Sequence, residues 1–235
     1  MITRLTGGVA TAALLAAVTT VVHAQAQPPQ VKIPEPGVPQ IMTIEGSFVR
    51  GAYNNEAYAI IGYQLANATV GGEWMLLEFG TTVLDRTPDY RLKREHLSLE
   101  TPDGKTLPLP TLEEYRAAPE VQALIARGKV TRQSINYFPV MASQGCRIGF
   151  FADLDQRALP WDQVELSNTR ACVGRLFFKI PGGIAYGQHW LNIKYQDSTL
   201  RVPFRIFTKD EEKTLNKNFK SIKKQVDEAF KPKKK

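Results

Sequence analysis

The feature that most constrains the fold is a set of segments in which apolar residues occupy every second position. In one of them, Leu191, Ile193 and Tyr195 alternate with Asn192 and Lys194. Successive side chains of a β-strand point to opposite faces, so this pattern indicates strands with one apolar face, as in antiparallel sheets packed on one side. The segments are 74–83, 175–180, 190–195 and 200–207.

The turn sequences agree with a mainly β fold. Gly104 ends the segment Thr101-Pro-Asp-Gly and can adopt the positive φ that a tight hairpin requires. Residues 196–198 separate the last two predicted strands as a second hairpin. Pro203 cannot donate a ladder hydrogen bond, so we expect its strand to have a free edge. The sequence therefore predicts an antiparallel β-sandwich over residues 41–208.

A helical insert interrupts these strands at residues 111–128. Thr111 and Glu114 form a capping box at its start, and Pro119 predicts a break into two pieces. We expect the insert to cover an open end of the sandwich or to form a small lid.

Residues 209–235 predict a basic amphipathic helix and tail. Thr208 and Glu211 form a second capping box, and apolar residues recur every three or four positions. Burying each of them contributes roughly 1.5–3 kcal/mol, so we expect them to pack either on the sandwich or on a partner protein. This apolar stripe consists of Leu215, Phe219, Ile222, Val226 and Phe230.

The first 26 residues have the composition of a signal peptide. Arg4 precedes an apolar stretch over residues 5–22, and Ala24 and Ala26 supply the small residues of a cleavage site. The alternative is a retained membrane anchor, although the stretch is marginal for a hydrocarbon core of about 30 Å. The leader predicts a secreted or periplasmic protein. Residues 27–40 contain five prolines and predict an extended linker.

The chain has two cysteines, Cys146 and Cys172, which lie 26 residues apart. In an exported protein such a pair usually forms a disulfide, which would stabilise the fold by roughly 3.5 kcal/mol. A buried free pair or a metal site is the alternative. Zinc would need more ligands, and neither His96 nor His189 is paired with a cysteine in the sequence. We therefore expect a disulfide, no metal and no cofactor.

Most of the net charge of +7 belongs to the C-terminal segment, because residues 209–235 hold ten lysines and five acidic residues. A specific nucleic-acid-binding domain would carry its basic face on the folded body, which this distribution disfavours. A basic tail instead suits weak contact with an anionic surface such as a membrane.

Four basic residues share the outward positions of the predicted strands. If those strands pair, the residues form a basic stripe that could hold an acidic polymer, although a solvated outer face explains them equally well. The stripe consists of Lys179, Lys194, Arg201 and Arg205.

No catalytic set of residues is recognisable. His189 follows a glycine-rich loop and could be a general base, but no nucleophile with an orienting partner accompanies it. His96 lies among charged residues, as expected at a solvated strand edge. Two groups of carboxylates could bind calcium or cleave a glycoside, but the first lacks the twelve-residue loop pattern, and sequence cannot give the separation of the second. They are Asp153, Asp155, Asp162 and Glu165, and Asp85, Asp89, Glu95 and Glu100.

The segment Gly174-Arg-Leu-Phe-Phe-Lys-Ile-Pro181, followed by Trp190-Leu-Asn-Ile-Lys-Tyr195, resembles the closing strands of immunoglobulin-like modules in secreted bacterial proteins of uncharacterised function. Residues 96–109 share their strand–Asp-Gly–strand plan. The resemblance covers about residues 90–195, and the helical insert departs from it. It implies an immunoglobulin-like β-sandwich outside the cytoplasm and transfers no catalytic residues.

These observations favour a non-catalytic binding or structural module, secreted or periplasmic, whose ligand and partners the sequence does not identify. One alternative is a secreted hydrolase that uses carboxylates near the helical insert. The other is peripheral binding to an anionic surface through the basic C-terminal helix.

Overall fold

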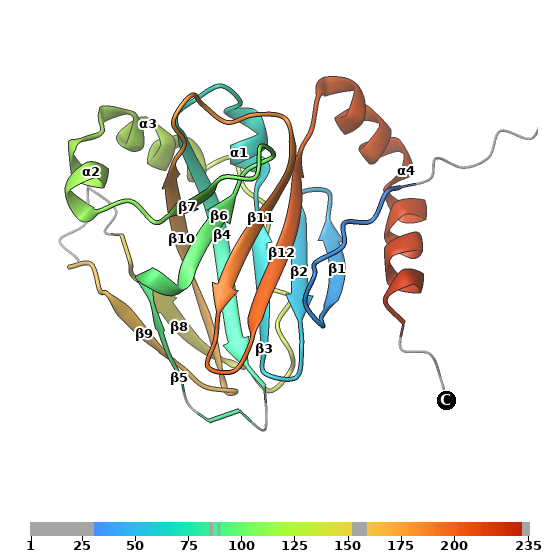
Figure 1. The fold of residues 1–235 in the computed structure, drawn as a ribbon, viewed down its shortest axis with the longest axis horizontal. Coiled ribbons are helices and arrows are strands. Elements are labelled where there is room, and N and C mark those ends of the chain that lie inside the picture. Colours follow the sequence, from blue (N-terminus) through green and yellow to red (C-terminus); the bar gives the residue numbers. More distant parts are fainter. Residues whose placement is uncertain (1–30, 85–86, 89, 152–158, 232–235) are drawn as a thin grey trace, which may run out of the picture.

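The computed structural model describes residues 31–84, 87–88, 90–151 and 159–231. Within them the chain is mainly β, with antiparallel sheets and a long C-terminal helix, as the sequence predicts (Figure 1). The predicted signal peptide, residues 1–26, lies outside the described residues, as do residues 27–30 of the predicted linker.

The larger sheet has six strands, and neighbours in it are antiparallel except for one pair. Strands β8 and β10 run parallel, which differs from the expectation of antiparallel pairing throughout. Parallel neighbours need a long connection, and residues 149–169 supply it. In spatial order the strands are β1 (Ile41–Gly46), β2 (Val49–Tyr53), β3 (Ala57–Gly62), β4 (Trp74–Val83), β10 (Arg170–Lys179) and β8 (Gln144–Ile148).

A four-stranded antiparallel sheet contains both predicted hairpins. Residues 195–198 join β11 to β12, and Gly104, with a φ of 81°, lies in the turn between β6 and β7. Strand β12 is an edge strand, as Pro203 predicts. The order is β12 (Thr199–Ile206), β11 (Gly187–Lys194), β6 (Leu97–Glu100) and β7 (Thr106–Pro108), and a separate small sheet pairs β5 (Tyr90–Lys93) with β9 (Gln163–Leu166).

The predicted helices form with their predicted caps. The helical insert gives α2 (Leu112–Ala117) and α3 (Pro119–Gly128), and the second capping box begins α4 (Lys209–Ala229). The sequence did not predict the short helix α1 (Gln64–Ala68) or the 3₁₀ turn η1 (Arg94–His96).

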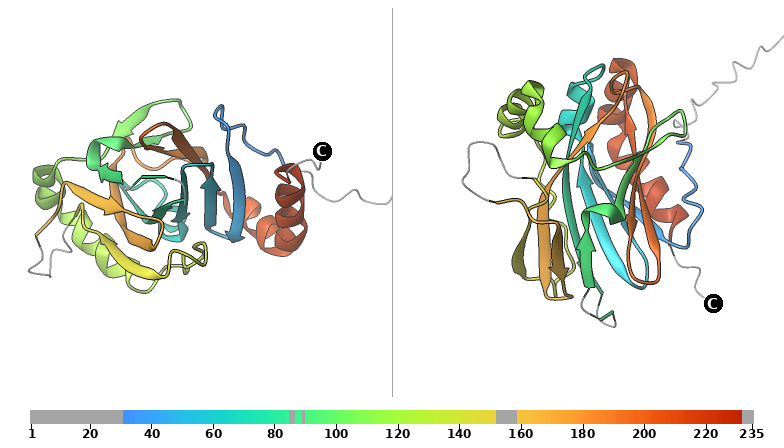
Figure 2. Two further views of the ribbon diagram at one scale, coloured as in Figure 1. Left: turned by 90° about the horizontal axis from the view of Figure 1, so that it is seen from below. Right: turned by 60° about the vertical axis from the view of Figure 1, so that its left-hand side comes forward.

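The six-stranded and four-stranded sheets pack face to face, and together they form what we call the β body (Figure 2). Their inward side chains are those that the alternation assigns to apolar faces, and they are almost fully buried. Examples are Leu77, Phe79, Leu176, Leu191 and Phe204.

The outward face of the six-stranded sheet is also covered, which the prediction of one buried face per strand missed. Leu76 of β4 and Phe177 of β10 point away from the four-stranded sheet, yet both are buried. The Tyr115 ring of α2 lies 5.0 Å from the Phe177 ring, and α3 packs on β4. The helical insert therefore covers this face at Leu76 and Phe177, which explains why apolar residues occupy these outward positions of β4 and β10.

Helix α4 lies beside the four-stranded sheet and covers the part of the six-stranded sheet that β12 leaves open (Figure 1). Ile44 of β1 packs there against Leu215, Ile222 and Val226, all of them buried, and the other two residues of the apolar stripe are half-buried. The sequence left open whether the stripe packs on the domain or on a partner. It packs on the domain, so it no longer argues for a partner.

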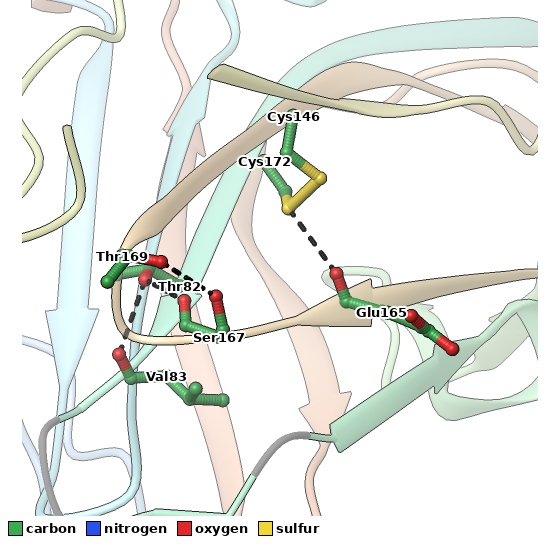
Figure 3. The surroundings of a disulfide bond; sticks show 7 residues. All are labelled: Thr82, Val83, Cys146, Glu165, Ser167, Thr169 and Cys172. Carbon is green, nitrogen blue, oxygen red and sulfur yellow. Dashed lines mark hydrogen bonds between the residues drawn. A yellow bond between two sulfur atoms is a disulfide. The ribbon is translucent and has the colours of Figure 1, made fainter. Parts of the chain in front are cut away.

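Cys146 and Cys172 form the predicted disulfide (Figure 3). They are register partners in the parallel pair, so the bond fastens the edge strand β8 to β10. The Cys172 sulfur lies 3.9 Å from the backbone carbonyl of Glu165 in β9. The Thr82 hydroxyl of β4 donates to the Ser167 carbonyl at 3.0 Å, which holds the turn between β9 and β10 on the six-stranded sheet.

Gly174 allows β8 to approach β10 closely. A Cβ atom there would meet the Ile148 carbonyl and lie 2.8 Å from Ile148 Cβ, whereas a Cβ at Gly145 would have nothing within 4 Å. We expect Gly174→Ala to lower the free energy of unfolding by about 1–3 kcal/mol, because β8 must move away. Gly145→Ala is the control, with a change below about 0.5 kcal/mol. Urea unfolding measures both, and equal stability of the variants would contradict the prediction.

Candidate functional site

A groove runs between α4 and the β body, next to the edge strand β12. Its volume is about 480 Å³, which lies within the range of sites for small molecules. Two stretches that are far apart in the sequence build it: residues 31–50, which include β1 and the start of β2, and residues 188–226, which include β12 and most of α4. Its apolar lining consists of Val31, Ile33, Pro34, Met42, Ile44, Pro203, Phe204, Phe207, Leu215, Ile222 and Val226.

Residues 31–40, the described part of the predicted linker, lie against the domain. The Val31 amide donates to Gln225 of α4 at 3.4 Å. The Gln40 side chain accepts from the Arg201 amide at 2.8 Å and donates to the Arg201 carbonyl at 2.7 Å, so it satisfies edge groups of β12. This part of the linker is therefore held on both α4 and β12, on either side of the groove.

Polar contacts fix the position of α4. The Asn67 side chain of α1 accepts from the Phe207 amide at 2.6 Å and donates to Glu212 at 3.3 Å. Phe207 lies just before the start of α4, and Glu212 lies in its first turn. Further along, the Lys223 ammonium donates to the Ile44 carbonyl and lies 3.6 Å from Glu45. These bonds are satisfied without a ligand, so the groove is preformed.

The charged groups of the groove differ in how they are paired. Arg205 binds Glu211 through two nitrogens, at 2.6 and 3.1 Å. Arg50 of β2 is buried and hydrogen-bonds only to backbone carbonyls among the described residues. Burial lowers the pKa of the Arg50 guanidinium, because an apolar setting solvates its charge poorly. Arg50 is a functional candidate that the sequence does not reveal, since its segment carries no motif or periodic pattern.

The lining of the groove combines an apolar wall with a few charged groups. Within the described residues its lining contains no histidine, cysteine or serine, and its two carboxylates are the exposed Asp210 and the paired Glu211. An apolar wall with fixed charges can enclose an apolar or amphiphilic molecule and orient it.

The structure does not bring the basic stripe together. Lys179 lies on β10 of the six-stranded sheet, whereas the other three residues lie on β11 and β12. Arg201 pairs with Glu100 at 2.6 Å, and Arg205 pairs with Glu211. The stripe fails as one surface because β10 and β11 belong to different sheets, although they are consecutive in the chain.

His189 is fully buried and cannot contact a substrate as a general base. Its ring stacks on Phe204, with centroids 5.2 Å apart, and Nδ1 lies 3.1 Å from the Gly187 carbonyl. A carbonyl only accepts, so in the neutral ring Nδ1 carries the hydrogen and donates. Nε2 has no hydrogen-bond partner within the described part of the chain. His189 is therefore a core residue of β11.

The other predicted candidates do not converge on the groove. His96 is half-buried, and its Nδ1 lies 2.6 Å from the Tyr90 hydroxyl. Where a described candidate carboxylate forms an ion pair, its partner is a neighbouring basic side chain of the protein. Glu165, for example, lies 3.3 Å from Arg91 on the paired strand. Asp85, Asp89, Asp153 and Asp155 lie outside the described residues.

A second hollow, of about 630 Å³, lies on the outward face beside β8 and β10. It is lined by Arg132, Arg147 and Arg175, but Arg175 pairs with Glu78 at 3.4 Å. The groove beside α4 is the stronger candidate site, because it joins a continuous apolar wall to a buried charge.

Comparisons with known proteins do not place the chain in a family. No protein-family model, curated protein or solved structure matches it. Between residues 31 and 231, as far as they are described, no helix is long and apolar enough to cross a membrane. In the same part of the chain no group of three or more acidic, histidine or cysteine side chains could hold a metal ion.

The buried His189 predicts a pH dependence of stability. Burial lowers the pKa of His189, although the Gly187 carbonyl opposes this. As the pH falls through the unfolded-state pKa of about 6.5, the unfolded chain gains a proton that the folded chain does not, so the free energy of unfolding decreases. We expect His189→Phe to reduce this loss between about pH 7 and pH 5.5.

Urea unfolding at the two pH values measures the effect. An ordinary carboxyl group, with a pKa of about 4, titrates below that window. His96→Gln is the control and should keep most of the loss, because that ring is partly exposed and its pKa is lowered by a smaller burial. An unchanged pH dependence in His189→Phe would contradict the prediction.

Proposed function

We propose that this chain is a non-catalytic binding module, secreted or periplasmic, which holds an apolar ligand in the groove between α4 and the β body. The observation that carries the proposal is the groove itself. Its wall is mainly aliphatic and aromatic, and the N-terminal segment and α4 are held in place by hydrogen bonds that need no ligand.

The proposed location is supported by the leader and the disulfide. The first 26 residues have the composition of a signal peptide, and a disulfide between the only two cysteines persists best in an oxidising compartment. The two packed sheets and the Asp-Gly hairpin between β6 and β7 support the proposed likeness to immunoglobulin-like modules.

The removal of apolar surface from water is the driving force for binding in such a groove. A ligand that covers this wall removes apolar surface from water, at roughly 25 cal/mol per Å². Preformed walls lose little conformational entropy on binding, so more of this free energy appears as affinity. The groove therefore favours a compact or chain-like apolar molecule over a polar one.

Thr214→Phe tests the groove, because Thr214 is exposed and lines it. A ring there should occupy part of the groove and weaken the binding of the neutral apolar dye Nile red by about tenfold or more. The matched control is Asn216→Phe, which places the same ring on the other side of Leu215, outside the lining. Fluorescence titration gives both affinities.

Two results would overturn the proposal. One is that Nile red fails to bind the unaltered protein. The other is that both phenylalanine variants bind the dye as the unaltered protein does, while circular dichroism shows that each is folded.

A second candidate function, contact with an anionic surface, is favoured by the outer side of α4. Its apolar stripe faces the β body, and lysines recur at spacings of four, three and four on the exposed side. Lys217 and Lys220 have no acidic partner among the described residues. This lysine face consists of Lys213, Lys217, Lys220 and Lys224.

Substitution tests the lysine face better than deletion of α4, which would expose Ile44 and the core. We expect Lys217→Gln, Lys220→Gln and Lys224→Gln combined to weaken binding to phosphatidylserine vesicles by about 100-fold, at about 1 kcal/mol for each lysine. Vesicle co-sedimentation at two salt concentrations measures this.

The control removes the same charge away from α4, with Lys105→Gln, Lys179→Gln and Lys194→Gln combined. These lysines are exposed on β10, on β11 and in the turn after β6. Equal binding by the two triple variants would exclude the lysine face as the contact surface.

A further inference from the structure

Arg50 is a charged group on the wall of an apolar groove. It lies in β2 opposite Ile44 of β1, so its side chain emerges on the face that α4 covers. Only 8% of its surface is exposed, and that side chain belongs to the groove lining. A guanidinium in this position is unusual, because arginine is almost never buried without a partner.

The guanidinium is only partly satisfied by the protein. Nη1 donates to the carbonyls of Gly46 and Val49, at 2.8 and 2.9 Å, and Nη2 donates to the Ser47 carbonyl at 3.1 Å. The group also lies 5.3 Å from the centre of the Tyr63 ring, as in a cation–π contact. Of its five N–H groups, the Nε hydrogen and one Nη2 hydrogen have no acceptor among the described residues.

No carboxylate neutralises Arg50 in the described part of the chain. The nearest comparison is Arg205, which lines the same groove but is bound by Glu211. A buried charge without a counter-ion is costly, and carbonyl oxygens and an aromatic ring offset only part of that cost. The groove therefore offers an anion a position beside Arg50 that no carboxylate of the described residues occupies.

The rest of the wall selects what that anion is attached to. Leu215, Ile222 and Val226 form a strip along α4, and Ile44 and Met42 face it from β1. Val226 follows Leu215 by eleven residues of α4, or about 16 Å along the helix, and the wall is mainly aliphatic, which suits a hydrocarbon chain. A planar carboxylate matches the fork of a guanidinium and can accept both remaining hydrogens.

We propose that the groove binds a fatty acid, with its carboxylate on Arg50 and its chain along the apolar stripe of α4. The inference depends on the proposed function, because it names the ligand class of the same groove. It also predicts that affinity rises with chain length, by about fourfold for each added methylene group until the groove is full.

Displacement of Nile red compares dodecanoate with dodecan-1-ol, which has the same chain and no charge. Both are used below the concentration at which micelles form. We expect the unaltered protein to prefer dodecanoate by about tenfold or more. In Arg50→Gln, Nile red and dodecan-1-ol should bind as before, and dodecanoate should bind about tenfold more weakly.

The matched control is Arg205→Gln, which removes the groove arginine that already has a carboxylate partner. It should change the affinity for dodecanoate by less than about threefold. If Arg50→Gln loses Nile red binding, the role of Arg50 is tested instead with variants that keep Arg50 and remove the other two cations of the lining. A preference for dodecanoate that survives both Arg205→Gln and Lys32→Gln then supports Arg50, the remaining cation of the lining.

The outcomes separate the two proposals. Equal displacement by dodecanoate and dodecan-1-ol in the unaltered protein overturns the fatty-acid inference and leaves an apolar binding groove. A preference for dodecanoate that disappears in Arg205→Gln or Lys32→Gln overturns the role of Arg50. Failure of Nile red, dodecanoate and dodecan-1-ol to bind at all overturns both proposals.

Discussion

The packing of the apolar stripe of α4 on β1 is the contact on which the rest of this structure depends. The six-stranded sheet is wider than the sheet that faces it, so without α4 the inward side of β1 would meet water. Ile44 then would have no partner layer, and Leu215, Ile222 and Val226 would lose theirs as well. Burial of such side chains contributes roughly 1.5–3 kcal/mol each, which is a large part of a typical net stability of about 5–15 kcal/mol. The helix therefore belongs to the fold and is not an appendage of it.

Much of this architecture is predictable from local patterns, and its site is not. The capping boxes at Thr111 and Thr208 and the alternation in residues 74–83 act over a few residues, so helix starts and strands follow from them. The apolar stripe shows that α4 has a buried face, but the surface that receives it lies in β1, far away in the sequence. Arg50 has no sequence signal, since its burial depends on α4, β1 and the 46–49 turn at once. The interpretation of His189 as a general base was wrong for the same reason. The glycine-rich loop before it is visible in the sequence, but its position in β11 against Phe204 is not.

The groove exists because a helix, and not a further strand, lies beside the edge strand β12. A strand beside β12 would lie about 4.8 Å away and would leave no space, whereas a helix with its side chains is about 10 Å wide and cannot pair with a strand edge. Pro203 removes one ladder donor from β12, and Gln40 binds edge groups at Arg201. Both features stop another strand from pairing there. The space that remains between helix and edge strand must hold side chains, water or a ligand.

The same geometry explains why the charge is where it is. Arg50 emerges near the β1–β2 turn, where the carbonyls of Gly46, Ser47 and Val49 converge and can accept from it without any acid. Those carbonyls keep the guanidinium oriented, and the Tyr63 ring covers it from the β body. Arg50 also belongs to the lining of the groove. Arg205 is different, because its charge is already neutralised by a carboxylate of the protein. It therefore attracts an anionic ligand only weakly. By holding Arg50 with dipoles instead of a counter-ion, the fold keeps a positive charge without a carboxylate partner in a mainly apolar groove, which is the pattern that an anionic amphiphile complements.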